Sequence, residues 1–279
     1  MSDMNDTNVS ATEAWQLCKV VDTSPFPGYP AGWEACPGWD NSNHAEGLFA
    51  VAARRCSDGT VAVAIQGTQN ILDVIKDFNV DPETFDPIPG SRISKGSHNG
   101  LLELLAMKAD DGTRLESFLR GLSGCELLIT GHSLGGNLAS VAAPWIASNI
   151  DTFKDWSSLR AITFAAPTAG DEVLKNTLDA QARYEAHFNL YDVVPHAWAT
   201  DGILNLDKVK DFFPKAGPTP APQEVQTIID KKTAQIQAAG MAYQQTEGSL
   251  FEGEIQSGMS WMAQLAYQHN DAYDAQFPS

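Results

Sequence analysis

Short apolar runs alternate with stretches of helical periodicity through most of the chain. The apolar runs predict strands at residues 48–54, 61–66, 125–130, 161–165 and 187–191. The periodic stretches predict helices at residues 11–20, 71–78, 101–107, 115–122 and 137–150. Strands that alternate with helices indicate an α/β fold with a mostly parallel central sheet and helices on both faces.

Turn residues separate these elements. Ser57-Asp58-Gly59 joins the first two predicted strands, which favours a hairpin. Residues 24–39 are rich in Pro, Gly and Trp, and residues 82–96 hold three prolines and two glycines. Both stretches are therefore predicted to be irregular loops.

Residues 201–258 depart from the alternating pattern. They contain a Pro-rich stretch at 214–222 and then an amphipathic helix. The apolar face of this helix holds Val225, Ile228, Ile229, Ile236 and Ala239. We interpret residues 1–279 as a single domain, with 201–258 as a candidate cap or lid inserted in it. As a cover, the helix would line an acyl pocket with its isoleucines; the alternative is that this face packs on the outside of the sheet.

Length and charge narrow the class of protein. A chain of 279 residues suits one large α/β domain. The formal net charge of −17 disfavours nucleic acid and anionic membrane surfaces as partners. No apolar run predicts a transmembrane segment. Residues 1–10 show no Sec signal peptide, which leaves a cytoplasmic protein, a chain whose signal has been removed, or export by a signal-independent route.

The four cysteines do not suggest a metal site, because none forms a CxxC pair. We expect neither a metal nor another cofactor. Cys18, Cys36 and Cys56 leave room for one disulfide in an oxidising compartment. Cys125 opens an apolar strand and is predicted to be a buried free thiol.

The sequence Gly131-His132-Ser133-Leu134-Gly135 matches the nucleophile-elbow pattern G-x-S-x-G. The pattern alone is weak, but here it follows a predicted strand and opens a predicted helix, the setting that exposes the serine hydroxyl. A glycine-rich turn with an incidental serine is the weaker interpretation. Ser133 is the predicted nucleophile, and the backbone N–H of Leu134 is the predicted oxyanion donor.

A serine nucleophile needs an imidazole to take its proton and a carboxylate to orient that imidazole. In α/β hydrolases the chain order is serine, acid, histidine. Asp192 is the best candidate acid, because it follows a predicted strand at the edge where such sites lie. A turn-capping role is the alternative for Asp192, and Asp171 and Asp201 are weaker candidate acids.

His269 is the predicted base. His196 is the second candidate, but it lies only four residues after Asp192. The remaining histidines are interpreted as structural residues: His44, His98, His132 and His187.

These segments together resemble the class 3 lipases, the family of the filamentous-fungal triacylglycerol lipases. The resemblance lies in TGHSLGG at 130–136, VAVAIQGTQNILDVIKD at 61–77, Lys95-Gly96, ITFAAPTAGD at 162–171 and NLYDVVP at 189–195. It implies that Thr68 supplies the second oxyanion donor through its N–H and hydroxyl. Gln66, Val74 and Ser97 stand where the family usually has Arg, Trp and Phe.

The resemblance implies an α/β-hydrolase fold and a serine carboxyl-ester hydrolase, a lipase or esterase that cleaves acyl esters such as acylglycerols. The expected partner is a lipid or small ester, with transient contact at a lipid interface. Residues 71–80 are a second candidate lid by position. Two alternatives stay open: a phospholipase-type effector, and a non-catalytic binding protein on a hydrolase scaffold.

Overall fold

A seven-stranded sheet forms the centre of the computed structural model, which describes residues 9–40, 49–68, 75–212 and 221–278. The strand order is β1-β2-β3-β6-β7-β8-β9. The strands are β1 (Trp33–Ala35), β2 (Ala50–Arg55), β3 (Val61–Ile65), β6 (Leu127–His132), β7 (Leu159–Phe164), β8 (Tyr184–Asn189) and β9 (Ser249–Phe251). From β3 onward neighbouring strands are parallel, whereas β1, β2 and β3 pair antiparallel.

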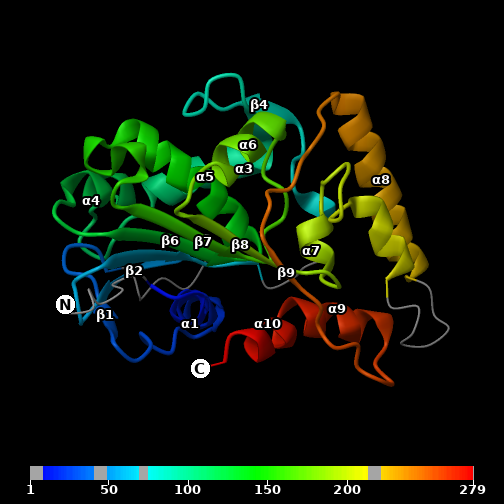
Figure 1. Cartoon of the computed structure of the whole chain (residues 1–279), viewed down its shortest axis with the longest axis horizontal. Helices are drawn as coiled ribbons and strands as arrows, with labels where there is room; N and C mark the ends of the chain where they lie inside the picture. Colours follow the sequence, from blue (N-terminus) through cyan, green and yellow to red (C-terminus); the bar gives the residue numbers. More distant parts are fainter. Residues whose placement is uncertain (1–8, 41–48, 69–74, 213–220, 279) are drawn as a thin grey trace, which may run out of the picture.

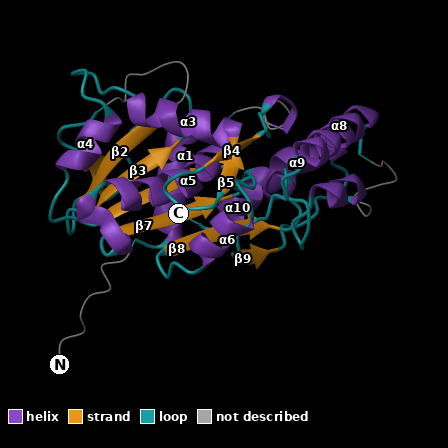
Figure 2. Cartoon of the chain, turned by 90° about the horizontal axis from the view of Figure 1, so that it is seen from above, coloured by secondary structure: helices purple, strands orange, loops and turns teal. Residues whose placement is uncertain are grey.

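Helices cover both faces of the sheet (Figure 1). One face is covered by α3 (Lys95–Ala106), α4 (Leu115–Gly121), α5 (Leu134–Asn149) and α6 (Glu172–Asp179). The other face is covered by α1 (Ala11–Asp22) and α10 (Asp271–Gln276). The mostly parallel sheet and its two helical layers confirm the predicted fold class; Figure 2 shows the same layers from above.

A third group of helices lies at the carboxyl end of the parallel strands. It consists of α7 (Val193–His196), α8 (Gln223–Ala239), α9 (Trp261–His269) and the 3₁₀ helix η2 (Leu206–Asp211). Another 3₁₀ helix, η1 (Asp151–Trp156), follows α5. Figure 1 shows α8 at the side of the molecule, away from both helical layers.

The buried apolar side chains form three clusters, one beneath each of the two helical layers and one in the third group of helices. Two of them fill the space between the sheet and its two helical layers. The third joins Ile75 and Val80 to Trp198 and to the apolar face of α8, where Ile229 and Ile236 are buried. The apolar face of α8 therefore packs beside the strand ends instead of on the outside of the sheet.

Several predicted boundaries were wrong. The predicted loop at 82–96 contains a two-stranded ribbon, β4 (Pro82–Thr84) and β5 (Arg92–Ser94), and the first turn of α3. Ser94 starts α3 there by accepting a hydrogen bond from the Ser97 N–H, a capping signal that the prolines obscured. The predicted loop at 24–39 contains β1. The last predicted strand ends earlier, at Asn189.

Some predictions fall outside the described residues: position 48 of the first strand, 71–74 of the predicted helix, most of the Pro-rich stretch, and His44. Residues 75–77 are helical.

Within the described ranges all four cysteines are free thiols, and Cys125 is only partly buried, contrary to expectation. None of the helices in the described ranges is long and apolar enough to cross a bilayer.

Candidate active site

The predicted elbow is a sharp turn between β6 and α5. Ser133 has φ 57° and ψ −126°, a strained conformation that orients its side chain away from the strand. A side chain on Gly135 would overlap the Ile65 carbonyl oxygen, and one on Gly131 would overlap the Gly135 backbone. These two glycines therefore allow α5 to begin immediately above β3 and β6.

Ser133 lies at the N-terminus of α5, and Leu134 is the first helical residue. The positive end of the helix dipole and the unpaired first-turn N–H groups favour negative charge at this position. Only 1% of Ser133 is exposed, so the predicted nucleophile is covered.

The predicted acid and base form a buried pair. The Nδ1 atom of His269 lies 2.8 Å from the Oδ2 atom of Asp192, and the residues are 2% and 0% exposed. Asp192 also accepts a hydrogen bond from the Val194 N–H, at 3.0 Å, as the N-cap of α7. Asp192 thus caps α7 with one carboxylate oxygen and contacts His269 with the other.

Two residues that the sequence did not single out hold this pair in place. The Asn189 side chain donates to the carbonyl and side-chain oxygens of Gln268, the residue before the base, at 2.9 and 2.7 Å. The Tyr273 hydroxyl donates to Asp192 Oδ2, at 3.3 Å, and accepts from the Asn189 N–H. In the sequence, only the position of Tyr273 shortly after His269 pointed to such a role. Its hydrogen-bond partner, Asp192, could not be predicted from the sequence.

The predicted base and the predicted nucleophile are not hydrogen-bonded to each other. Among the described residues, neither Ser133 Oγ nor His269 Nε2 has a hydrogen-bond partner. Burial lowers the pKa of His269; the charge of Asp192 opposes this effect, the charge of His132 adds to it, and the pKa lies below its ordinary value. The imidazole is therefore neutral near pH 7, the form that can accept a proton.

The second predicted oxyanion donor lies in the loop after β3. Gly67 approaches the elbow so closely that a Cβ atom there would lie 3.0 Å from the Ser133 Cβ. Thr68 and Leu134 both line a cavity of about 410 Å³, together with Phe49, Phe78 and Leu138. Its lining also contains polar side chains, among them Asp77 and Glu103, so the two candidate oxyanion donors share one cavity of mixed character.

The other candidate residues lie in different surroundings. Both ring nitrogens of His196 lie within hydrogen-bond distance of backbone atoms of Asn205 and Leu190. Asp171 caps α6 and accepts from the Val173 and Leu174 N–H groups.

In the described parts of the chain, no three His, Cys, Asp or Glu side chains are grouped to hold a metal ion.

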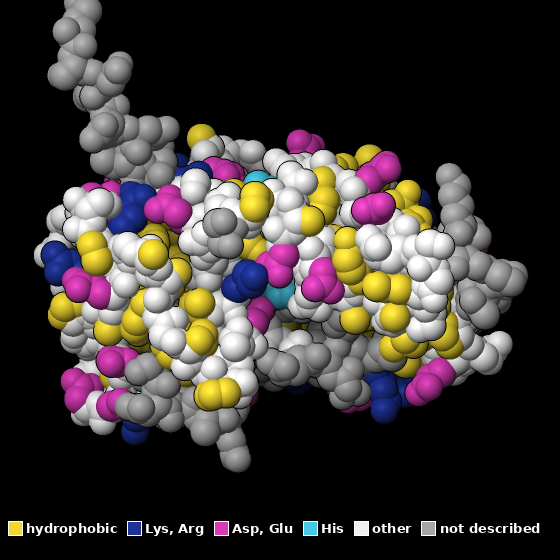
Figure 3. Space-filling view, turned by 90° about the horizontal axis from the view of Figure 1, so that it is seen from below, with side chains coloured by type: hydrophobic (Ala, Val, Ile, Leu, Met, Phe, Trp, Pro, Cys, Tyr) yellow, Lys and Arg dark blue, Asp and Glu magenta, His cyan; other side chains and the backbone are white. Residues whose placement is uncertain are grey.

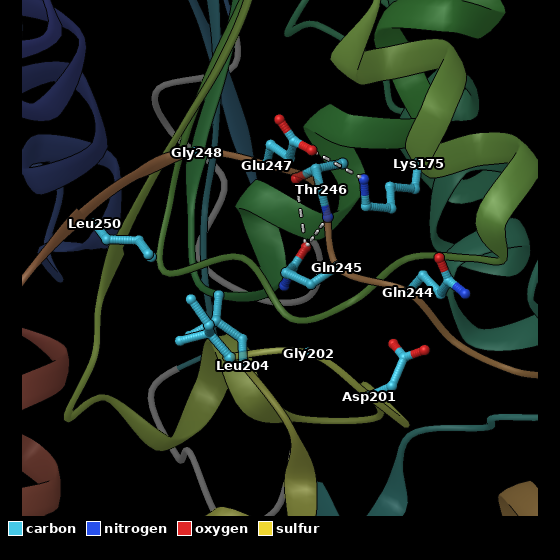
Figure 4. Close-up of a pocket in the computed structure, with 11 residues that line it drawn as sticks. Lys175, Asp201, Gly202, Leu204, Gln244, Gln245, Thr246, Glu247, Gly248 and Leu250 are labelled. Carbon is cyan, nitrogen blue, oxygen red and sulfur yellow. Dashed lines mark hydrogen bonds and ion pairs between the residues drawn. The ribbon is translucent and has the colours of Figure 1, made fainter.

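A second cavity, of about 350 Å³, is lined by Asp201, Lys175 and Glu247 among others (Figure 4). Lys175 points toward Glu247, at 3.6 Å, and also pairs with Asp179. This cavity shares no lining residue with the one beside Leu134. Asp201, one of the weaker candidate acids, therefore lines a different cavity from Leu134 of the elbow.

A strained serine between a central parallel strand and a helix, with a buried Asp–His pair at the same sheet edge, defines the α/β-hydrolase class. The family described as lipase (class 3) matches residues 62–202, which include the elbow and Asp192. The chain belongs to this family.

Known relatives agree with this family. A lipase of Rhizomucor miehei is 28% identical over 53% of this chain and 40% of its own length. Phospholipase A1-II 3 of Oryza sativa subsp. japonica is 26% identical over 67% of this chain and 50% of its own. The chain thus spans half or less of these curated relatives. The crystal structure of M37 lipase has the same fold, with a TM-score of 0.72 and 24% identity over 82% of this chain and 72% of that one.

Proposed function

We propose that this protein is a serine carboxyl-ester hydrolase that uses Ser133, His269 and Asp192 as nucleophile, base and acid. The buried 2.8 Å contact between His269 and Asp192, beside a strained elbow serine, is the observation that carries the proposal. A neutral imidazole oriented by a buried carboxylate is what a serine needs in order to attack an ester.

In the acylation step, Ser133 Oγ attacks the ester carbonyl carbon and its proton passes to His269 Nε2. Asp192 stabilises the resulting imidazolium through Nδ1–H. The negative oxygen of the tetrahedral intermediate accepts hydrogen bonds from the N–H groups of Leu134 and Thr68. The imidazolium then gives its proton to the departing alcohol, and water activated by His269 hydrolyses the acyl-enzyme.

The proposed substrates are esters of fatty acids, acylglycerols first. The apolar part of the 410 Å³ cavity, formed by Phe49, Phe78, Leu134 and Leu138, suits an acyl chain. Hydrophobic side chains are present on the face shown in Figure 3. Met259, just before α9, and Met262, in α9, are exposed. Transient contact with a neutral lipid interface would use this region, and the net charge of −17 disfavours nucleic acid.

The test is labelling and removal of the nucleophile. We expect an alkyl phosphonate to modify Ser133, and we expect Ser133→Ala to lose at least about a thousandfold in kcat without unfolding. Circular dichroism verifies the fold. Retention of more than a few per cent of activity by the variant excludes Ser133 as the nucleophile.

Phospholipid hydrolysis is the second candidate, supported by the relative named phospholipase A1-II 3. Rates on diacylglycerol and phosphatidylcholine in matched micelles distinguish the two. A chain that hydrolyses neither lipid, nor short p-nitrophenyl esters, and resists the phosphonate would instead be a binding protein on a hydrolase scaffold.

The candidate lid was predicted as residues 201–258, of which Ser249–Phe251 form β9 of the sheet. We also propose that the part before β9, residues 201–248, called here the cover segment, sets access to the cavity. The segment is attached to residues 75–80 by two hydrogen bonds: Lys232 Nζ of α8 donates to the Phe78 carbonyl at 2.7 Å, and the hydroxyl of Tyr243, which follows α8, donates to the Val80 carbonyl at 2.6 Å. The α8 isoleucines expected to line an acyl pocket do not line the 410 Å³ cavity, because they face Ile75 and Val80. The cover segment would therefore act through Phe78.

Phe78 is the side chain that links the cover segment to the cavity. It packs against the apolar cluster that contains Ile229 and Ile236 of α8, and it lines the 410 Å³ cavity. Its ring centroid is 4.7 Å from that of Trp198, which belongs to the same cluster. We expect Phe78→Ala to change the ratio of kcat/KM for long over short p-nitrophenyl esters by about tenfold, since it enlarges an apolar pocket. Phe118→Ala, on α4 beside Trp39, is the control and should leave the ratio unchanged, because Phe118 does not line the cavity. An unchanged ratio in Phe78→Ala would exclude this role.

A further inference from the structure

A second buried histidine lies directly behind the proposed triad. The His132 ring lies beside the His269 ring, with centroids 4.4 Å apart. Its Nδ1 atom is 2.8 Å from Asp22 Oδ2, and its Nε2 atom is 2.9 Å from the carbonyl oxygen of His269. The mechanism above does not use this histidine.

The partners of His132 define its protonation state. A carbonyl oxygen can only accept, so Nε2 must carry a proton. Asp22 Oδ1 accepts a hydrogen bond from the Gly67 N–H at 2.7 Å, and an ionised carboxylate has no proton that Oδ2 could donate to Nδ1. Nδ1 must therefore also carry a proton, and an imidazole with two N–H groups is a cation.

The surroundings of His132 come from three parts of the chain. Asp22 and the edge of Trp15 face the ring from α1, Tyr273 from α10, and His269 from the end of α9. Burial lowers the pKa of His132, but the hydrogen bond and charge of Asp22, with the more distant charge of Asp192, raise it above its ordinary value.

We propose that Asp22 and His132 are positioning residues of the catalytic centre, with His132 held as an imidazolium that anchors the His269 backbone and keeps its ring neutral. This inference rests on the hydrolase function proposed above. Asp22 holds the Gly67 N–H, so the same carboxylate fixes the loop that carries Thr68. One residue at the end of α1 thus connects the oxyanion loop to the base.

The first test observes protonation without requiring activity. We expect ¹⁵N-histidine NMR of the Ser133→Ala protein to show both His132 nitrogens protonated at pH 7, with His132→Gln identifying the signals. Asp22→Asn should move the His132 titration to lower pH by at least about one unit, because it removes the paired charge. A neutral His132 ring at pH 7 overturns the proposal.

The second test uses the pH dependence of kcat/KM on a short p-nitrophenyl ester. We expect His132→Gln to move the acid limb to higher pH, because it removes the cation that disfavours protonation of His269. We expect Asp22→Asn to lower kcat about tenfold with little change in KM, and Asp22→Glu to restore part of the loss. His98→Gln, on α3, is the matched control and should change neither quantity.

The outcomes separate this proposal from the proposed function. A wild-type protein that hydrolyses no ester contradicts the function, while the NMR test still decides the charge of His132. An active enzyme whose acid limb is unchanged, or moved to lower pH, in His132→Gln contradicts the positioning role and leaves the triad intact. Asp22 is at a partly exposed helix end, so Asp22→Asn keeps the test available if His132→Gln does not fold.

Discussion

The sheet and the cover segment are built in different ways. Parallel strands β3, β6, β7 and β8 are joined by continuous backbone ladders and carry the elbow at one edge. In the cover segment, α8 contacts residues 75–80 through its apolar face and through side-chain hydrogen bonds such as that from Lys232 to the Phe78 carbonyl. A ladder fixes the positions of Ser133 and the neighbouring loops closely, whereas a docked helix can move as a unit. The proposed catalytic residues are thus carried by a different part of the fold from the segment proposed to select the substrate.

The largest expected difference between the two regions is in catalysis. We expect Asp192→Asn to lower kcat about 10³–10⁴-fold, because the amide no longer stabilises the His269 imidazolium. Asp201→Asn makes the same change nine residues later, on the exposed surface of the cover segment, and should alter kcat less than twofold. Steady-state kinetics of both variants is the measurement. Equal losses would mean that the acid has been assigned to the wrong position.

Stability gives the next comparison. Ile129 in β6 and Ile229 in α8 are each 1% exposed, so the same truncation can be made in both regions. We expect Ile129→Ala to lower the free energy of unfolding by about 2–5 kcal/mol. Ile229→Ala should cost less in urea denaturation and should speed protease cleavage within residues 201–248, because the docked helix opens locally. Equal losses without faster cleavage would place α8 in the same cooperative core.

The smallest expected effect is in the pH profile. Because burial lowers the pKa of His269, kcat/KM should rise with pH and reach half its maximum below the ordinary histidine value of about 6.5. His196→Ala should keep this profile, since both ring nitrogens of His196 contact backbone atoms. A rate that is flat from pH 5 to 8 would argue against a histidine base.

Much of the sheet could be predicted because its buried strands are continuous apolar runs separated by turn residues. The elbow was also predictable, since its glycines and serine follow one such run. β1 and the β4–β5 ribbon were missed, because three-residue strands among prolines and glycines have no periodicity to detect. The predicted acid and base, Asp192 and His269, lie 77 residues apart in sequence and 2.8 Å apart in the structure. They could be paired in advance because α/β hydrolases have the chain order serine, acid, histidine.

The residues that hold the site together could not be predicted. Asp22, His132 and Asn189 act through partners more than 75 residues away in the chain. Nothing in their local sequence distinguishes them from helix-end, turn or strand residues. Such partners become visible only when the fold brings α1, β6 and α9 together.

The two outer strands of the sheet are each only three residues long. β1 and β9 are the edges of the sheet, where unpaired backbone groups could align with another copy of the chain. A three-residue edge offers few such groups, and a chain of net charge −17 repels its copies at a distance. The protein should therefore tolerate high concentration and refold from denaturant with little strand-mediated aggregation, and acidification toward the sequence pI of about 4.5 should weaken that protection.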